Sequence, residues 1–193
     1  MKLKIIKMKR VKSTNNLALK LIKRKKLNPT LISSQAQTNG RGTMGKKWIS
    51  QRGNLFISIF FEINQKKIDF KQYVLLNAYL FQDIIKKFTK KKIDIKWPND
   101  LMFQKEKICG ILQEVVNVNT KSFLIVGVGI NTNTSPIIKN YKTTSLNRIL
   151  RKKINNYKIL EKIIKDYEKF IEKNIKKIFF KLKKKILKNK LII

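Results

Sequence analysis

The chain has 193 residues, of which 42% are hydrophobic, which is enough for one domain with a substantial core. Its 46 Lys and Arg residues outnumber 11 Asp and Glu residues, so the formal net charge at pH 7 is +35. The chain has no histidine and a single cysteine, Cys109, which excludes serine–histidine and cysteine–histidine catalysis, most zinc sites and an internal disulfide.

The basic charge has two interpretations. A strongly basic domain can bind nucleic acid or an anionic membrane. Alternatively, Lys, Asn, Ile and Phe have codons built mostly of A and T, and an AT-rich genome would place them on every solvated surface. The lysines occur in nearly every segment rather than along one stripe, which favours the second interpretation. The single cysteine, together with the lack of a membrane-length apolar run or a secretory signal, predicts a cytoplasmic protein.

The predicted elements are helices at both ends of the chain and mainly strands in the middle. Apolar residues at helical spacing indicate the helices, and runs of β-branched and aromatic residues indicate the strands. This order predicts an α+β fold with a mixed, mostly antiparallel sheet flanked by helices. In chain order, we expect a helix capped by Ser13 or Thr14, a short strand after Pro29, a buried strand at 55–61, a helix at 70–90, a strand at 91–97 that ends before Pro98, a hairpin at 100–116 with its tip at 104–106, a strand at 122–133, and helices after Pro136 that continue into 176–193.

One stretch, "QTNGRGTMGKKW" at 37–48, concentrates three of the seven glycines beside cations and a tryptophan. It does not match the phosphate loop, which needs Lys-Ser/Thr after its last glycine, or the dinucleotide fingerprint, whose glycine spacing differs. Backbone N–H groups at the glycines and the neighbouring cations would nevertheless suit an anion. The alternative is a flexible surface loop with incidental lysines.

Three further stretches stand out, "KWPNDL" at 96–101, "KEKICGILQE" at 105–114 and "GVGINTN" at 127–133. Asp100 either caps a turn or orients Mg²⁺ or an incoming amine. Lys107 is either an ordinary solvated lysine or a functional cation near the hairpin tip. The glycines inside the last strand indicate close approach of a ligand or of another backbone.

Taken together, these stretches resemble the catalytic domain of biotin–protein ligases. The resemblance covers nearly the whole chain and implies the biotin–lipoate ligase fold, which is similar to that of class II aminoacyl-tRNA synthetases. It also implies a single catalytic domain over 1–193, without the N-terminal helix-turn-helix and the C-terminal β-barrel that some relatives carry. The shared motifs are "STN" at 13–15, Gln37, "GRG..G..W" from Gly40, "KWPNDL" from Lys96, "K..GIL.E" from Lys107 and "G.GIN" from Gly127.

The resemblance implies a reaction that needs no histidine. The biotin carboxylate would attack the α-phosphate of ATP, in the presence of Mg²⁺, to form biotinyl-5′-AMP and pyrophosphate. A lysine of the biotin carboxyl carrier protein of acetyl-CoA carboxylase would then accept the biotin and release AMP. The implied partners are therefore biotin, ATP and this carrier protein, with no specific DNA, no membrane and at most a weak homodimer.

Residue roles follow from the resemblance by position. Lys107, Arg41 and Asp100 are expected to take part in catalysis, and no side chain is assigned as a metal ligand. Many relatives carry a second arginine where this chain has Thr43, and its loss predicts weaker retention of the adenylate. The residues expected to bind biotin are Ser13, Thr14, Asn15, Gln37, Gly40, Arg41, Gly42, Thr43, Lys107 and Gly110, and those expected to bind ATP are Lys46, Trp48, Lys96, Asn99 and Asn131.

Three alternatives stay open at this point. Lipoate or octanoate ligases share the fold, although their arginine-glycine loop differs and they lack "KWPND". A basic nucleic-acid-binding protein would account for the charge alone. The third alternative is a ligase that has lost its activity together with its C-terminal barrel.

Overall fold

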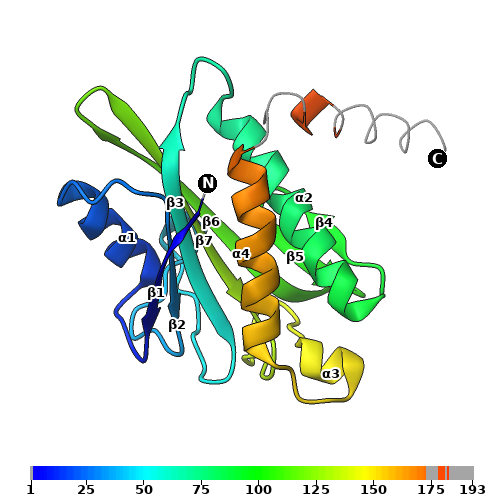
Figure 1. Cartoon of the computed structure of the whole chain (residues 1–193). Coiled ribbons are helices and arrows are strands. Elements are labelled where there is room, and N and C mark those ends of the chain that lie inside the picture. The colour runs from blue at the N-terminus through cyan, green and yellow to red at the C-terminus, as the bar shows by residue number, and fades with distance from the viewer. Residues whose placement is uncertain (1, 173–177, 181, 183–193) are drawn as a thin grey trace.

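The computed structural model describes residues 2–172, 178–180 and 182, which form one seven-stranded sheet with helices on both faces (Figure 1). The strand order is β1-β2-β3-β7-β6-β5-β4; β1 and β2 pair in parallel and every other pair is antiparallel. The predicted α+β class with a mixed, mostly antiparallel sheet is confirmed. The strands are β1 (Lys4–Met8), β2 (Thr30–Ser34), β3 (Leu55–Ile63), β4 (Asp94–Lys96), β5 (Asp100–Phe103), β6 (Glu106–Val118) and β7 (Lys121–Ile130). The helices are α1 (Thr14–Lys23), the 3₁₀ turn η1 (Thr43–Gly45), α2 (Phe70–Thr89), α3 (Leu146–Leu150) and α4 (Asn156–Glu172).

The two faces of the sheet carry different layers. Helix α1 packs on one face, and α2 and α4 cover the opposite face (Figure 1). The larger apolar core lies under α2 and α4 and includes Ile57 and Phe81, whereas a smaller cluster under α1 includes Ile22 and Phe60. Because β3 is buried on both faces, its sequence is an almost continuous apolar run rather than an alternating one.

Local chemistry explains where the helices begin. Ser13 caps α1, and its Oγ accepts a hydrogen bond from the backbone N–H of Asn16. Asp69 and Gln72 form a reciprocal capping box at the start of α2, and Lys90 ends this helix in the left-handed conformation. The predicted cap at Ser13, the helix near 70–90 and the hairpin tip near Lys105 are therefore confirmed.

The segment after Pro136 differs from the prediction. The first helix there begins only at Leu146, because residues 131–145 form an irregular loop that pairs with the start of β6. Lys107 N–H donates to Lys142 O at 2.9 Å, and Thr144 N–H donates to Lys107 O at 3.0 Å. The expected helical continuation over 176–193 lies largely outside the described residues. None of the described helices is both long and apolar enough to cross a lipid bilayer.

A buried polar cluster joins the layers of the larger core. The Tyr167 hydroxyl on α4 donates to Asn77 Oδ1 on α2, and Asn77 Nδ2 donates to Gln113 Oε1 on β6 at 2.7 Å. Asn77 and Tyr167 are both fully buried, and burial raises the pKa of the Tyr167 hydroxyl well above its usual value. The hydroxyl is therefore neutral over the physiological range and acts as a hydrogen-bond donor.

Replacement of Tyr167 by phenylalanine is expected to lower the free energy of unfolding by about 1–3 kcal/mol, because the buried amide oxygen of Asn77 loses its donor. Urea denaturation measures this change. Tyr157→Phe is the matched control, since Tyr157 is 56% exposed, and it should shift stability by less than about 0.5 kcal/mol. Equal effects of the two substitutions would contradict the prediction.

Candidate functional site

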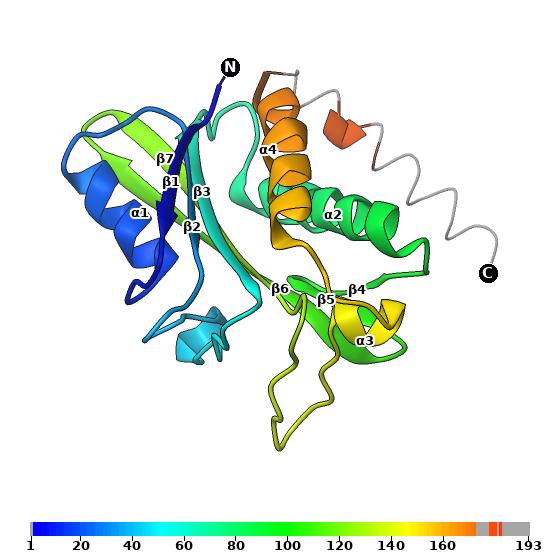
Figure 2. The same ribbon diagram turned by 60° about the horizontal axis from the view of Figure 1, so that its bottom comes forward.

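A cavity of about 450 Å³ opens on the α1 face of the sheet. It is bounded by the N-terminus of α1, the glycine loop (residues 37–48), the turn between β4 and β5, and strands β6 and β7. Figure 2 shows η1 and the 131–145 loop at the same end of the sheet. Of the predicted site residues, Gly40 and Asn131 do not line this cavity. Those that do are Ser13, Thr14, Asn15, Gln37, Arg41, Gly42, Thr43, Lys46, Trp48, Lys96, Asn99, Asp100, Lys107 and Gly110.

The first turn of α1 supplies a wall of short polar side chains. Thr14 donates to Gln37 Oε1 from both its backbone N–H, at 2.8 Å, and its hydroxyl, at 3.1 Å. Ser58 on β3 lies behind the wall, and its Oγ is 2.8 Å from Thr14 Oγ1 and 2.5 Å from Asn15 Oδ1. Thr14 and Asn15 are almost completely buried, so their orientations are fixed before any ligand arrives.

Gly40 supports the cavity without lining it. Its carbonyl accepts the backbone N–H of Trp48 at 2.9 Å, and a Cβ at this position would lie 2.4 Å from Trp48 O. Gln37 Nε2 donates to Ser50 Oγ at 2.9 Å and ties the two ends of the glycine loop together. The Gly42 N–H donates to Lys46 O, so it is used inside the loop rather than pointing into the cavity.

The floor of the cavity is made by glycines of β6 and β7. Gly110 and Gly129 face each other across the two strands, and the Trp48 indole lies against both. A Cβ on Gly110 or Gly129 would come within 2.5 or 2.3 Å of the indole, and a Cβ on Gly127 would lie 2.0 Å from Asn15 Oδ1. Only glycine permits these approaches, which explains the "GVG" pattern.

Lys107 is a largely buried cation at the edge of this floor. Its Nζ lies 2.8 Å from Asp100 Oδ1, and the Lys107 and Asp100 side chains are only 14% and 20% exposed. The same Nζ is 5.2 Å from the centre of the Trp48 ring and 5.4 Å from that of Tyr141. Lys105, at the hairpin tip, is exposed. Its burial and its ion pair set Lys107 apart from an ordinary solvated lysine, and its role as a functional cation stays a prediction.

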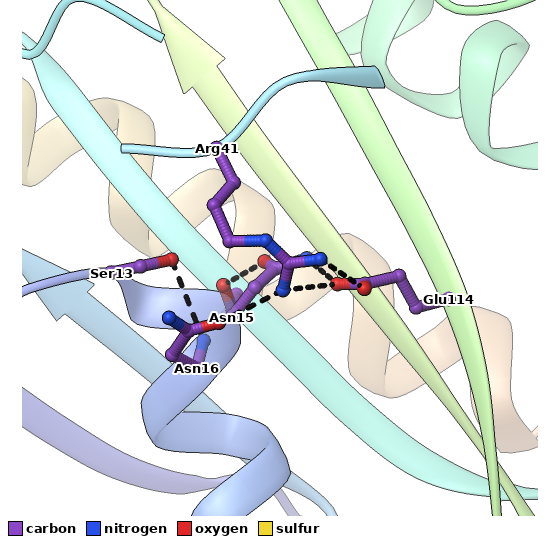
Figure 3. A network of polar contacts seen from close by, with 6 residues as sticks. Ser13, Asn15, Asn16, Arg41 and Glu114 are labelled. Atoms are coloured by element: carbon purple, nitrogen blue, oxygen red, sulfur yellow. Dashed lines mark hydrogen bonds and ion pairs between the residues drawn. The ribbon is translucent and has the colours of Figure 1, made fainter. Parts of the chain in front are cut away.

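Arg41 reaches away from the glycine loop and into an ion pair (Figure 3). Its Nη2 lies 2.6 Å from Glu114 Oε1 and its Nη1 lies 3.1 Å from Glu114 Oε2, a two-pronged contact. The same Nη1 donates to Asn16 Oδ1 at 2.8 Å, and Asn15 Nδ2 donates to Glu114 Oε2 at 2.8 Å. Both arms of the guanidinium are thus engaged by protein groups.

The residues expected to bind ATP are spread around the mouth of the cavity. Lys46 and Lys96 are exposed at the rim, and the Asn99 carbonyl accepts the backbone N–H of Ile111 at 2.9 Å. Asn131 is buried in a small adjoining pocket shared with Trp48 and Tyr141. Its Oδ1 and the Trp48 Nε1 are buried and have no hydrogen-bond partner within the described part of the chain.

Several residues that contribute to the site were not predicted. Tyr141 comes from the 131–145 loop, Trp97 and Met44 form exposed apolar parts of the rim, and Ser58 supports the wall. Glu114 was part of a recognised motif but had no assigned role. The sequence offered one indication of a role for Glu114, since it is one of only 11 acidic residues in a chain with 46 cations.

The chemistry of the cavity does not include a preformed metal cage. Within residues 2–172, 178–180 and 182, no three His, Cys, Asp or Glu side chains gather closely enough to hold an ion. Asp100 is the single carboxylate among the residues that line the cavity. Mg²⁺ is commonly bound by one or two carboxylates together with substrate phosphates and water, so this site fits Mg²⁺ only as a companion of a polyphosphate.

Solved structures define the class of protein. Biotin protein ligase from Aquifex aeolicus in complex with biotin and ATP matches with a TM-score of 0.70 and 33% identity, over 88% of this chain and 72% of that chain. The P. falciparum LipL1 structure in complex with lipoate, at 15% identity, is similar in fold alone, with a TM-score of 0.57 over 88% of this chain and 63% of that one. The sheet and its helices therefore have the biotin and lipoate ligase fold.

The family follows from the sequence match. The model of the biotin/lipoate A/B protein ligase family matches residues 7–131, and the chain belongs to this family. The bifunctional ligase/repressor BirA of Bacillus subtilis is 31% identical over 164 residues, which are 81% of this chain. The chain spans half or less of the length of the BirA proteins of B. subtilis and Escherichia coli.

Proposed function

We propose that this chain is a biotin–protein ligase, which activates biotin with ATP and transfers it to a lysine of the biotin carboxyl carrier protein of acetyl-CoA carboxylase. The observation that carries the proposal is the buried Lys107 ammonium at the end of a glycine-floored cavity whose other end is a wall of short polar groups. Biotin has a polar bicyclic ring at one end and a carboxylate at the other, which matches this arrangement.

Binding follows from the positions of these groups. The wall formed by Ser13, Thr14 and Asn15 offers hydroxyl and amide groups to the ureido ring of biotin. The acyl chain would cross the floor beside the Trp48 indole, where apolar contact is available. The carboxylate would then lie next to Lys107, which provides an ammonium in a cavity of reduced solvent access.

The two chemical steps balance without a histidine. A carboxylate oxygen of biotin forms a bond to the α-phosphorus of ATP as pyrophosphate leaves, and Lys107 stabilises the charge that develops there. The neutral amine of the acceptor lysine then attacks the acyl carbon, the bond from that carbon to the phosphate oxygen breaks so that AMP leaves, and the attacking nitrogen loses a proton to solvent. Trp97 and Met44 at the rim, with Tyr141, would limit access of water to the anhydride.

Mg²⁺ would enter with the triphosphate and neutralise part of its negative charge. Asp100 would be the protein carboxylate available to it, in competition with the Lys107 ammonium that the carboxylate contacts. Asn99 and Asn131 would supply amide groups close to the nucleotide, with Lys46 and Lys96 as exposed cations at the mouth.

The direct test is incorporation of labelled biotin into a purified carrier domain in the presence of ATP and Mg²⁺. We expect labelling of one lysine that depends on ATP, and no labelling when lipoate or octanoate replaces biotin. Transfer of lipoate in preference to biotin would support the alternative ligase of the same fold. No transfer of any acyl group by the folded protein would support the inactive alternative.

A basic nucleic-acid-binding protein is the candidate from a different class. The net charge of +35 makes some DNA binding at low salt expected in any case. We expect this binding to be independent of sequence and to be lost steeply as salt rises, because it would come from counterion release alone. A footprint on a defined sequence that survives physiological salt and competitor DNA would favour nucleic-acid recognition.

Thr43→Arg is expected to improve retention of biotinyl-5′-AMP, because Thr43 lines the cavity where many relatives carry an arginine. A charge-assisted hydrogen bond is worth about 1.5–3 kcal/mol, so the arginine variant should release the adenylate more slowly. The measurement is biotinylation of bystander lysines on an added non-acceptor protein, which should fall. Equal bystander labelling by both proteins would show that neighbouring cations already provide this contact.

A further inference from the structure

Arg41 is a cation in the glycine loop, but its charge is not directed at the space where the reacting groups would meet. Its guanidinium makes a two-pronged ion pair with Glu114, at 2.6 and 3.1 Å, and also donates to Asn16 on α1 (Figure 3). A planar guanidinium bound along one edge to a carboxylate is held in orientation as well as in position. Its positive charge is largely offset by the Glu114 carboxylate.

Glu114 serves two elements of the site at once. One of its oxygens accepts both from Arg41 and from Asn15 Nδ2, which lies 2.8 Å away. Asn15 is fixed at its other end, because its Oδ1 lies 2.5 Å from Ser58 Oγ and rests on Gly127. Glu114 therefore holds the polar wall and the glycine loop in one geometry.

The pairing stands out against the composition of the chain. With 46 cations and 11 acids, most lysines and arginines have no carboxylate available. Glu114 is the acid that lies beneath the wall, on β6, and both partners of the pair are only about one-third exposed, at 36% and 28%. An ion pair that is tied into a hydrogen-bond network is stronger than an isolated surface pair.

We propose that Glu114 is a positioning residue of the biotin site and that Arg41 acts through it as a clamp on the glycine loop, rather than as a catalytic cation. The clamp joins α1, β6 and the loop, and so prepares the wall before biotin binds. The positive charge at the reacting phosphate is then left to Lys107. This inference rests on the proposed function and deepens it, since it assigns the positioning of the polar wall to Arg41, through Glu114, and the contact with the reacting carboxylate and phosphate to Lys107.

The test compares four proteins, the wild type, Arg41→Gln, Glu114→Gln and the double variant. Biotin-dependent exchange of pyrophosphate into ATP gives kcat and the KM for biotin, and calorimetry gives the affinity for biotin without ATP. We expect each single variant to weaken biotin binding about tenfold while kcat changes by less than about twofold, because the clamp prepares binding and does not touch the reacting atoms. The double variant should bind biotin no more weakly than the single variant with the lower affinity, since both substitutions remove the same contact.

A matched control is available on the same sheet. Glu62 pairs with Lys121 at 2.8 Å across β3 and β7, and both side chains are about half exposed and do not line the cavity. Glu62→Gln should leave the KM for biotin unchanged. The inference is overturned if Arg41→Gln lowers kcat strongly while Glu114→Gln has no effect, or if the two losses in biotin affinity simply add.

A readout without biotin separates this inference from the proposed function. The backbone N–H groups of Gly42, Lys46 and Trp48 are hydrogen-bonded within the glycine loop, so their hydrogen exchange reports whether the loop is held closed. We expect faster exchange at these amides in Glu114→Gln and no change in Glu62→Gln. If the wild type does not exchange pyrophosphate into ATP when biotin is present, the proposed function is rejected and the clamp is not. If Glu114→Gln leaves the hydrogen exchange of these amides unchanged, the clamp is rejected and the proposed function is not.

Discussion

Lys107→Met is expected to slow the formation of biotinyl-5′-AMP by about a hundred- to a thousandfold, the usual cost of removing one preorganised donor to a developing charge. The ammonium is held in place by Asp100 at 2.8 Å and by the rings of Trp48 and Tyr141. It would meet the biotin carboxylate first and the extra charge on the α-phosphate later. The loss should therefore appear in the single-turnover rate more than in the affinity for biotin.

Lys105→Met is the control for this substitution, because Lys105 is two residues away and exposed at the hairpin tip. It should adenylate biotin at nearly the wild-type rate. Removal of Lys107 also leaves the Asp100 carboxylate without its counter-ion, which could destabilise the protein. The thermal stability of Lys107→Met should therefore be compared with that of Lys107→Met/Asp100→Asn, in which the unpaired charge is removed as well. Equal adenylation rates in Lys107→Met and Lys105→Met would remove Lys107 from the mechanism.

Gly129→Ala is expected to have the second-largest effect, because the new methyl group would lie 2.3 Å from the Trp48 indole. Forcing an extra carbon into a packed contact costs about 1–3 kcal/mol of unfolding free energy. The displaced indole would also disturb the floor of the cavity, and a misplacement of about 1 Å can cost about a hundredfold in rate. Urea denaturation and single-turnover adenylation measure the two effects.

The same substitution in a Trp48→Ala background tests the cause. If the clash with the indole is responsible, Gly129→Ala should cost nothing in stability once the ring is gone, and the loss of a flexible glycine from β7 should slightly favour the folded state. An equal loss of stability in both backgrounds would show that the strand itself, rather than Trp48, rejects the side chain.

Much of the fold could be predicted because its elements are encoded locally. Ser13 marks the start of α1, the apolar spacing from Phe70 marks α2, and the apolar run at 55–61 marks β3. The 131–145 loop could not be predicted in the same way. Its conformation depends on backbone hydrogen bonds to Lys107, which lies far away in the sequence, and local propensity carries no information about such a partner.

The site shows the same contrast between features encoded locally and features that depend on distant segments. Residues within short motifs, such as Asn15, Asp100 and Lys107, were expected, and they come together around one cavity. Asp100 and Lys107, which are close in the sequence, pair with each other, but the contacts that join distant segments were not predicted. Arg41 and Glu114 are 73 residues apart, and a basic residue in a glycine-rich stretch suggests an anionic ligand until its protein partner is known.

The central strand pairing affects how a new chain folds during synthesis. Leu55 pairs with Ile130 and Ile63 with Ser122, so β3 acquires its central neighbour only after β7 has left the ribosome. Until then, one of the most apolar segments of the chain has an open edge that could join another nascent chain. Lysines in nearly every segment make such chains repel one another, so the many cations that lie outside the cavity would protect the protein from aggregation while it is being made.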